Sequence, residues 1–246
     1  MEIETTELIK EAIIVIIASL FLGLLLSLEI SWPVLSIEPA SFGLMFLLSF
    51  FMLMIFVLAQ KVTAEKLDCK IRTKFLSFRR YWFQPPIEQG KAKLPFDFPA
   101  WLVLPLILLP VTIFFKLFPW LAILNFDIEP KATRVRRRWQ ELSEEDIGRI
   151  AISGPIAVLI LALIVRIAGF NEFALICAWL AFLALIPIGQ GFKIMNTIRI
   201  SWVFAIIFSL FTLVLMTLTA NTFATIIITL LLAALITIIY CTTFEK

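Results

Sequence analysis

The chain has 246 residues, of which 61% are hydrophobic and 16% are charged, with a net charge of +3 and no histidine. Soluble domains are about 45–50% apolar and about 25% charged, so this composition excludes an ordinary soluble fold, and the small net charge gives no reason to expect nucleic-acid binding. We expect an all-α polytopic integral membrane protein, with residues 1–246 forming one membrane domain.

Stretches without charge recur along the chain at membrane length. A helix needs about 20 apolar residues to cross a hydrocarbon core of about 30 Å. The last uncharged run, Ile200–Phe244, is too long for one crossing and divides at Ala220–Thr222. The sequence therefore predicts six transmembrane helices: about 11–28, 40–60, 147–168, 173–188, 201–219 and 223–240.

Two basic loops, 61–98 and 127–146, separate the early spans from the later ones. Within the first loop, Lys70–Phe83 alternates polar with apolar or aromatic residues, which predicts a small interfacial β element. Lysine and arginine mark the cytoplasmic side of a membrane protein, so both loops and both termini are expected in the cytoplasm. The acidic start of the chain, Glu2–Glu11, fits this orientation poorly.

The hydrophobic segment between the basic loops, about 99–126, contains Pro99, Pro105, Pro110 and Pro119. Proline removes a backbone hydrogen bond inside a helix, which argues against one smooth spanning helix. A single crossing would also place the two basic loops on opposite sides of the membrane. We therefore expect a re-entrant hydrophobic hairpin, packed against the other helices because irregular backbone is not tolerated against lipid.

The second basic loop is followed by a helix start. Ser143 precedes Glu144, Glu145 and Asp146. Serine is a preferred N-cap residue, and acidic residues in the first turn favour the helix dipole. We expect Ser143 to cap the third span.

The end of the second span carries the most specific pattern. Residues 56–69 read F-V-L-A-Q-K-V-T-A-E-K-L-D-C, which resembles the segment H-E-x-x-H-K-x-x-A-x-K-x-G-C of the site-2 protease family of intramembrane zinc metalloproteases. In this register Phe56 and Gln60 stand at the two histidine positions and Val57 stands at the glutamate position. The family needs those histidines to hold zinc and that glutamate as general base. The flanking residues that match are Lys61, Ala64, Lys66 and Cys69.

Two later segments resemble the same family in the same order. Residues 148–157 read G-R-I-A-I-S-G-P-I-A and are similar to the family's G-K/R-I-S-L-A-G-P-L. Residues 184–194 read A-L-I-P-I-G-Q-G-F-K-I and are similar to N-L-x-P-x-x-P-L-D-G-x-K-I, in which the aspartate is a zinc ligand. Ala184 stands at the asparagine position, and Gln190 stands at the aspartate position after a two-residue deletion. The matching residues are Gly154, Pro155, Pro187, Gly191 and Lys193.

The resemblance implies a degenerate member of the prokaryotic, especially archaeal, branch, placed in the cytoplasmic membrane and lacking the zinc ligands. It implies a catalytically inactive protein, a pseudoprotease, with no metal or cofactor. Its expected partners are the lipid bilayer and a transmembrane helix of a client or of a membrane complex. The second and fourth spans should touch, with Phe56 and Gln60 near Ala184 and Gln190, and the two glutamines should hydrogen-bond to each other.

Two alternatives stay open at this point. One is an active intramembrane metallopeptidase whose ligands the sequence does not reveal. The other is a small transporter or channel, which would place ionisable residues along a path through the middle of the membrane. The predicted spans are nearly free of such residues, apart from Arg166 and, in the re-entrant segment, Lys116.

Overall fold

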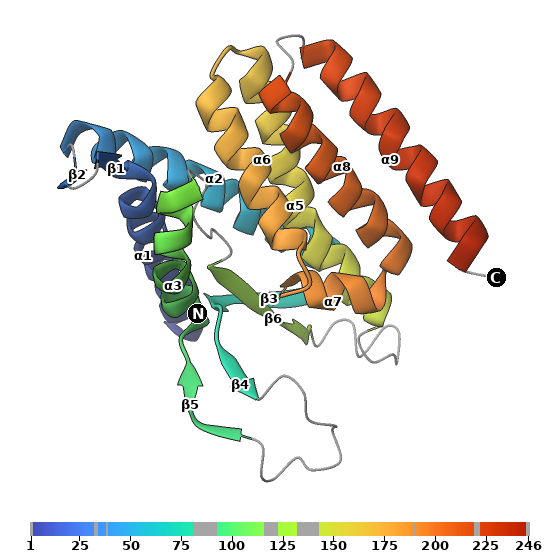
Figure 1. Ribbon diagram of the computed structural model, residues 1–246. Coiled ribbons are helices and arrows are strands. Elements are labelled where there is room, and N and C mark those ends of the chain that lie inside the picture. Colours follow the sequence, from blue (N-terminus) through green and yellow to red (C-terminus); the bar gives the residue numbers. More distant parts are fainter. Residues whose placement is uncertain are drawn as a thin grey trace.

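The computed structural model describes residues 2–31, 34–37, 39–80, 93–115, 123–131, 143–188, 190–218 and 222–244. Within these ranges the protein is mainly helical and has three small antiparallel sheets of two strands each (Figure 1). The helices are α1 (Glu2–Ser27), α2 (Pro39–Lys66), α3 (Ala100–Phe115), α5 (Glu144–Ile167), α6 (Asn171–Leu185), α7 (Gln190–Thr197), α8 (Arg199–Leu218) and α9 (Thr222–Phe244). The strands are β1 (Leu28–Ser31), β2 (Val34–Ile37), β3 (Cys69–Phe75), β4 (Phe78–Arg80), β5 (Lys93–Phe98) and β6 (Leu124–Pro130).

Four helical segments are long and apolar enough to cross a membrane: Glu7–Ser27, Ser41–Lys66, Glu144–Ile167 and Arg199–Thr217. They match the first, second, third and fifth predicted spans, and the membrane class of the protein is confirmed to this extent. The apolar parts of the fourth and sixth spans are shorter. Helix α6 has 15 residues and rises about 23 Å at about 1.5 Å per residue, which is less than the core thickness. The total of six crossings stays a prediction.

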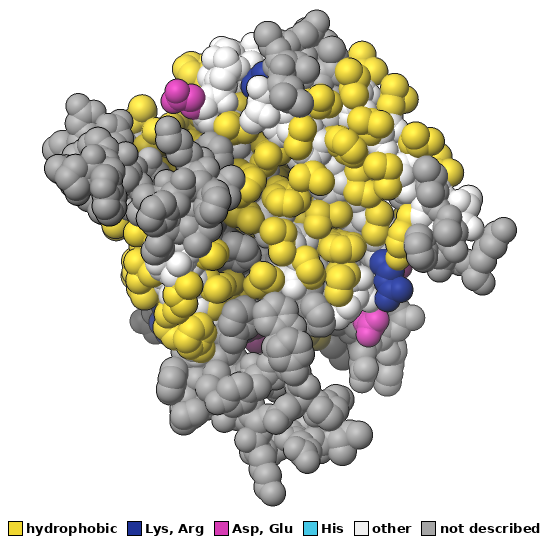
Figure 2. All heavy atoms as spheres, in the orientation of Figure 1, with side chains coloured by type: hydrophobic (Ala, Val, Ile, Leu, Met, Phe, Trp, Pro, Cys, Tyr) yellow, Lys and Arg dark blue, Asp and Glu magenta, His cyan; other side chains and the backbone are white. Residues whose placement is uncertain are grey.

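Helices α2 and α5 form the centre of the helical arrangement. Helix α1 packs against α2, α5 packs against both α2 and α6, and α8 lies between α6 and α9. Leu22, Met52 and Val158 are completely buried where these helices meet. The outer surface is also apolar, and Figure 2 shows hydrophobic side chains across much of the face that it displays. Large exposed side chains such as Leu47 and Leu231 (62% and 61% exposed) are those expected to face lipid.

A small β element is found in this loop, as predicted, but its partner strand was not foreseen, and its place at the membrane interface stays a prediction. Strand β3 pairs with β6 in antiparallel register, with Cys69 opposite Pro130 and Phe75 opposite Leu124. Leu124–Pro130 was predicted to belong partly to the re-entrant segment and partly to the second basic loop, and this prediction is wrong, because the segment is a strand. The sequence does contain a signal for this strand, because L-N-F-D-I-E alternates apolar and polar residues with the period of a strand.

The segment predicted to be re-entrant begins and ends beside this sheet. The backbone N–H of Trp101 donates to the carbonyl of Leu76 at 2.9 Å, and the N–H of Leu76 donates to the carbonyl of Ile123 at 2.8 Å. Both ends therefore lie at the same end of the bundle, as a re-entrant path requires. The membrane path itself stays a prediction.

The irregular backbone expected for that segment is not found in its first part. Ala100–Phe115 is one helix that contains Pro105 and Pro110. Each proline removes one helical hydrogen bond and bends the helix, and neighbouring helices can compensate for that loss inside a membrane protein. Pro119 and Lys116 lie outside the described residues.

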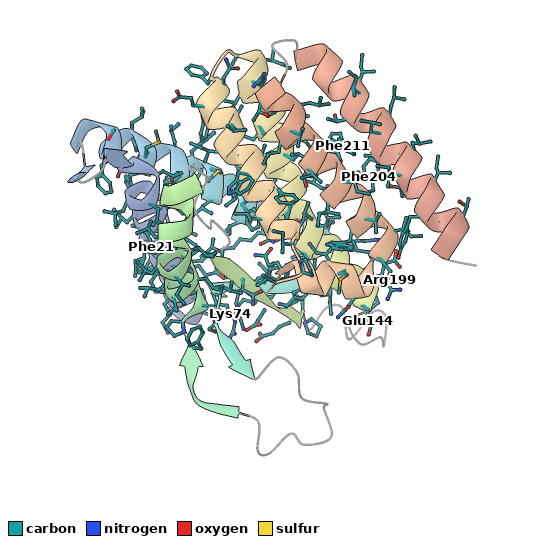
Figure 3. The ribbon with its side chains drawn as sticks, in the orientation of Figure 1. Phe21, Lys74, Glu144, Arg199, Phe204 and Phe211 are labelled. Atoms are coloured by element: carbon teal, nitrogen blue, oxygen red, sulfur yellow. The ribbon has the colours of Figure 1, made fainter. Side chains whose placement is uncertain are left out.

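Charged side chains gather at one end of the bundle. Lys74, Glu144 and Arg199 lie there, below the aromatic side chains of α8, in the view of Figure 3. Helix α5 starts at this end, and the hydroxyl of Ser143 accepts a hydrogen bond from the N–H of Asp146 at 3.1 Å. The predicted N-cap of α5 is thereby confirmed.

Candidate functional site

Two buried amide side chains join four elements at the point where the three motif segments meet. Gln60 of α2 donates from Nε2 to Oε1 of Gln190 of α7 at 2.9 Å, and to the carbonyl of Ala151 in α5 at 3.5 Å. Gln190 donates from its own Nε2 to the carbonyl of Leu124 in β6 at 3.0 Å. The two glutamines are 2% and 4% exposed. Because buried amides need hydrogen-bond partners, this glutamine pair holds α2, α5, α7 and β6 together, and the predicted contact is confirmed.

Gly154 brings the second motif to the same place. A Cβ atom on this residue would lie 3.0 Å from Cζ of Phe56 and 3.0 Å from Nε2 of Gln60. That separation is shorter than ordinary van der Waals contact, so a side chain there would require Phe56 and Gln60 to shift by a few tenths of an ångström. Small residues permit close helix packing in membranes. Gly154, followed by Pro155 inside α5, therefore lets α5 approach α2 beside the glutamine pair.

The space at this point is nearly filled. Phe56, Ala184 and Gln190 line a cavity of about 20 Å³. A cavity needs at least about 10–15 Å³ to hold one water molecule, so this cavity is the size of a water molecule and excludes a peptide. Val57 does not belong to it and instead lines a groove between α1 and α2. The structure thus brings together four of the five predicted site residues.

The flanking residues of the first motif occupy two environments. Ala64 and Cys69 are buried in a second apolar cluster, with Ile150 of α5. Lys61 forms an ion pair with Glu11 of α1. Lys66, in the last turn of α2, is exposed. The first two residues therefore contribute to packing, and Lys61 contributes to the contact between α1 and α2.

The third motif forms a tight turn and a contact with β6. A Cβ atom on Gly191 would lie 1.8 Å from the carbonyl oxygen of Ile186, so only glycine fits after the turn at Pro187. Lys193 donates to the carbonyl of Phe126, and its Nζ lies 4.4 Å from the centroid of the Phe126 ring. Burial lowers the pKa of Lys193 to about 8, although Asp127 opposes that shift.

An ion-pair network that was not predicted from the sequence lies at the charged end of the bundle. Glu7 of α1 lies 2.8 Å from Lys70 and 2.9 Å from Arg72 of β3. Glu11, one helical turn later, accepts a hydrogen bond from the backbone N–H of Thr73 at 3.0 Å. These contacts explain why an acidic segment lies at the same end as the basic β3. The spacing of Glu7 and Glu11, which places both on one face of α1, is the sequence feature that could have indicated this network.

The residues at the glutamine pair do not suit metal or acid–base chemistry. They supply amide groups, a phenyl ring and a methyl group, whereas zinc is held by thiolate, imidazole or carboxylate ligands. In the described ranges, no cluster of three or more His, Cys, Asp or Glu residues is placed to hold a metal ion. The implied zinc therefore does not fit these residues. That the protein binds no zinc stays a prediction.

Comparison with known proteins identifies no relative: no family model, no curated protein and no solved structure matches the chain. The resemblance to site-2 proteases consequently depends on the three motif segments and on the place where they meet.

Proposed function

We propose that the chain is a catalytically inactive, site-2-protease-like membrane protein that binds a transmembrane helix of a client or partner protein. The observation that carries this proposal is the meeting of Gln60, Gly154 and Gln190 at one buried point. Each comes from a different motif segment, and the segments follow the family's order along the chain. Chance matches in an apolar sequence have no reason to converge on one point in space.

The residues at this buried place also support the loss of catalysis. Peptide hydrolysis by a metalloprotease needs a metal-bound water and a general base. Gln60 and Gln190 offer neither, and Phe56 fills the space beside them. The amides satisfy each other and the carbonyls of Ala151 and Leu124. On this proposal, polar groups that once held a metal have been replaced by neutral groups that hold helices together.

A groove on the surface of α2 and α5 supports the binding of a helix. This groove, called the α2–α5 groove below, has a volume of about 650 Å³. Partly buried Ala59, Ser153 and Ala157 form its floor, between exposed aliphatic side chains that include Ile156 and Ile160. Small side chains allow close approach of a second helix in a membrane. Ala59 is adjacent in sequence to Gln60, although Gln60 itself is buried and does not line the groove.

The transporter alternative has less support. In the described part of the chain, the buried charged side chains are those of Asp146 and Arg166. They lie in the first and last turns of α5, whereas an ion path would place charged groups in the middle of the membrane. Lys116 lies outside the described residues.

The helix-binding proposal is tested by crosslinking in native membranes. A photo-reactive residue at Ala157 should capture a partner at a position inside that partner's transmembrane segment. Ala59→Phe should fill the groove and reduce capture about tenfold, which corresponds to about 1.4 kcal/mol of binding free energy. The matched control is Ile164→Phe, an exposed residue of α5 outside the groove (58% exposed). Equal capture by both variants, or crosslinks only to lipid, would contradict the proposal.

A further inference from the structure

An apolar groove runs along α1 and α2 on the outside of the bundle. This α1–α2 groove has a volume of about 260 Å³ and is lined by apolar residues that include Ala12, Ile16 and Met54. It extends along α2 from Lys61 to Phe50, a rise of about 16 Å at about 1.5 Å per residue. Half of a hydrocarbon core of about 30 Å is about 15 Å. The groove therefore has the length of an acyl chain in one leaflet.

A second hollow continues this groove at the charged end of the bundle. The hollow, called the charged pocket below, also has a volume of about 260 Å³. Leu8, Glu11 and Lys61 line both the groove and the charged pocket. An apolar channel of one-leaflet depth thus opens into a polar hollow at the charged end of the bundle. The charged side chains that line the pocket are Glu7, Glu11, Glu65, Lys61, Lys70 and Lys131.

One acid and one base of the pocket form no ion pair within the described part of the chain. Lys61 and Lys70 are paired with the two glutamates of α1. Among the residues that the structure describes, Glu65 and Lys131 form no ion pair with any other side chain. Glu65 lies near the end of α2, and Lys131 directly follows β6. The pocket therefore offers one free carboxylate and one free ammonium group to a ligand.

We propose that the α1–α2 groove and the charged pocket together bind one glycerophospholipid whose headgroup carries a phosphate and a primary ammonium group. An acyl chain lies in the groove. Lys131 pairs with the phosphate, because an ammonium group is a strong donor to phosphate oxygens. Glu65 accepts hydrogen bonds from the headgroup ammonium. An anionic headgroup would leave Glu65 unpaired, and a quaternary ammonium has no N–H to donate.

The lipid preference of the unmodified chain is the first test. The full chain, purified in detergent and freed of lipid, is titrated with phosphatidylethanolamine, phosphatidylglycerol or phosphatidylcholine of identical acyl chains. Native mass spectrometry then counts the bound lipids. We expect one phosphatidylethanolamine per chain, bound about tenfold more tightly than the other two lipids, as for loss of one charge-assisted hydrogen bond. Equal binding of the three lipids would overturn the proposal without any variant.

Four variants separate the headgroup from the acyl chain. Glu65→Gln should reduce binding of phosphatidylethanolamine to the level of phosphatidylglycerol, whereas Lys66→Gln, on the neighbouring exposed residue, should change nothing. Ala12→Phe should fill the groove and lower binding of all three lipids about tenfold. Ile13→Phe is its control, since Ile13 is exposed on the same helix and does not line the groove. If either control lowers binding as much as its paired variant, the site is not the one proposed.

Discussion

Gln60 and Lys61 are neighbours on α2, and they belong to two regions with opposite physical chemistry. Gln60 is 2% exposed and contacts another neutral amide inside the bundle. The side chain of Lys61 is 29% exposed and pairs with Glu11 at the surface of α1. A neutral amide can be buried at low cost when its hydrogen bonds are satisfied. An ion pair loses less solvation when it stays at the edge of the membrane.

The two regions are stabilised by different interactions. The glutamine pair contributes by satisfying buried polar groups, so it should be sensitive to any change that leaves one amide alone and insensitive to salt. The network of Glu7, Glu11 and β3 is partly exposed, so salt should screen it.

Gly191→Ala should disrupt the buried region most. The new Cβ would meet the carbonyl oxygen of Ile186 at 1.8 Å, so the turn that places Gln190 has to move. We expect a loss of more than about 4 kcal/mol in the free energy of unfolding, in the range of exceptional single substitutions. Thermal unfolding in detergent measures it.

Gly43→Ala is the matched control for that substitution. Gly43 lies within α2 and has open space around its Cβ position. Alanine is favoured over glycine in a helix by about 0.5–1 kcal/mol, so this variant should be unchanged or slightly more stable. If both glycine variants lose the same stability, close packing at Gly191 is not the cause.

Gln60→Leu should remove one half of the glutamine pair. Oε1 of Gln190 would then be buried without its donor, at a cost of about 1–3 kcal/mol. Changing both residues to leucine should cost less than the sum of the two single changes, because the two amides share one hydrogen bond. A double-mutant cycle measures this coupling, and additive losses would show that the pair does not act as a unit.

Lys193, which contacts Phe126 of β6, should make the stability of the fold depend on pH. Its pKa is lowered to about 8 in the folded protein and is about 10.4 in an unfolded chain. Between these values the unfolded state binds more protons, so the stability of the fold should rise as pH increases from about 8 to about 10.4. We expect a gain on the order of 3 kcal/mol over this range, at about 1.4 kcal/mol per pH unit. The slope should be absent in Lys193→Met, and an equal slope in that variant would assign it to another group.

Glu7→Gln should have the smallest effect and the strongest dependence on salt. Partly exposed ion pairs contribute about 0–1 kcal/mol, and Lys70 and Arg72 would lose their shared acid. The difference between the variant and the unmodified chain should shrink as salt is raised from about 0.01 M to about 1 M. A difference that does not change with salt would mean that the contact is not electrostatic.

Some of these features followed from the sequence, for physical reasons that differ between elements. The contact of Gln60 with Gln190 was predictable because the resemblance placed both at positions that must converge on one site. The pairing of β3 with β6 was not, since it joins segments far apart in the chain and has only a weak local signal in Leu124–Pro130. Val57 was expected at the same site, but the helical geometry of α2 turns it toward the α1–α2 groove.

The ion-pair network was not predictable from the sequence for another reason. Ion pairs between α1 and β3 depend on how two elements dock, and a list of charges does not contain that information. The aromatic residues Tyr81–Phe83 lie outside the described residues, so their predicted place at the membrane surface stays a prediction.

The zinc content of the purified protein distinguishes an inactive site from a catalytic one. The chain is purified without added metal or chelator, zinc is measured per mole of protein, and cleavage of a transmembrane substrate is assayed on the same sample. We predict zinc well below one per chain and no cleavage, because the site offers amides in place of imidazole and carboxylate ligands. About one zinc per chain, removed by a chelator together with a proteolytic activity, would contradict the account.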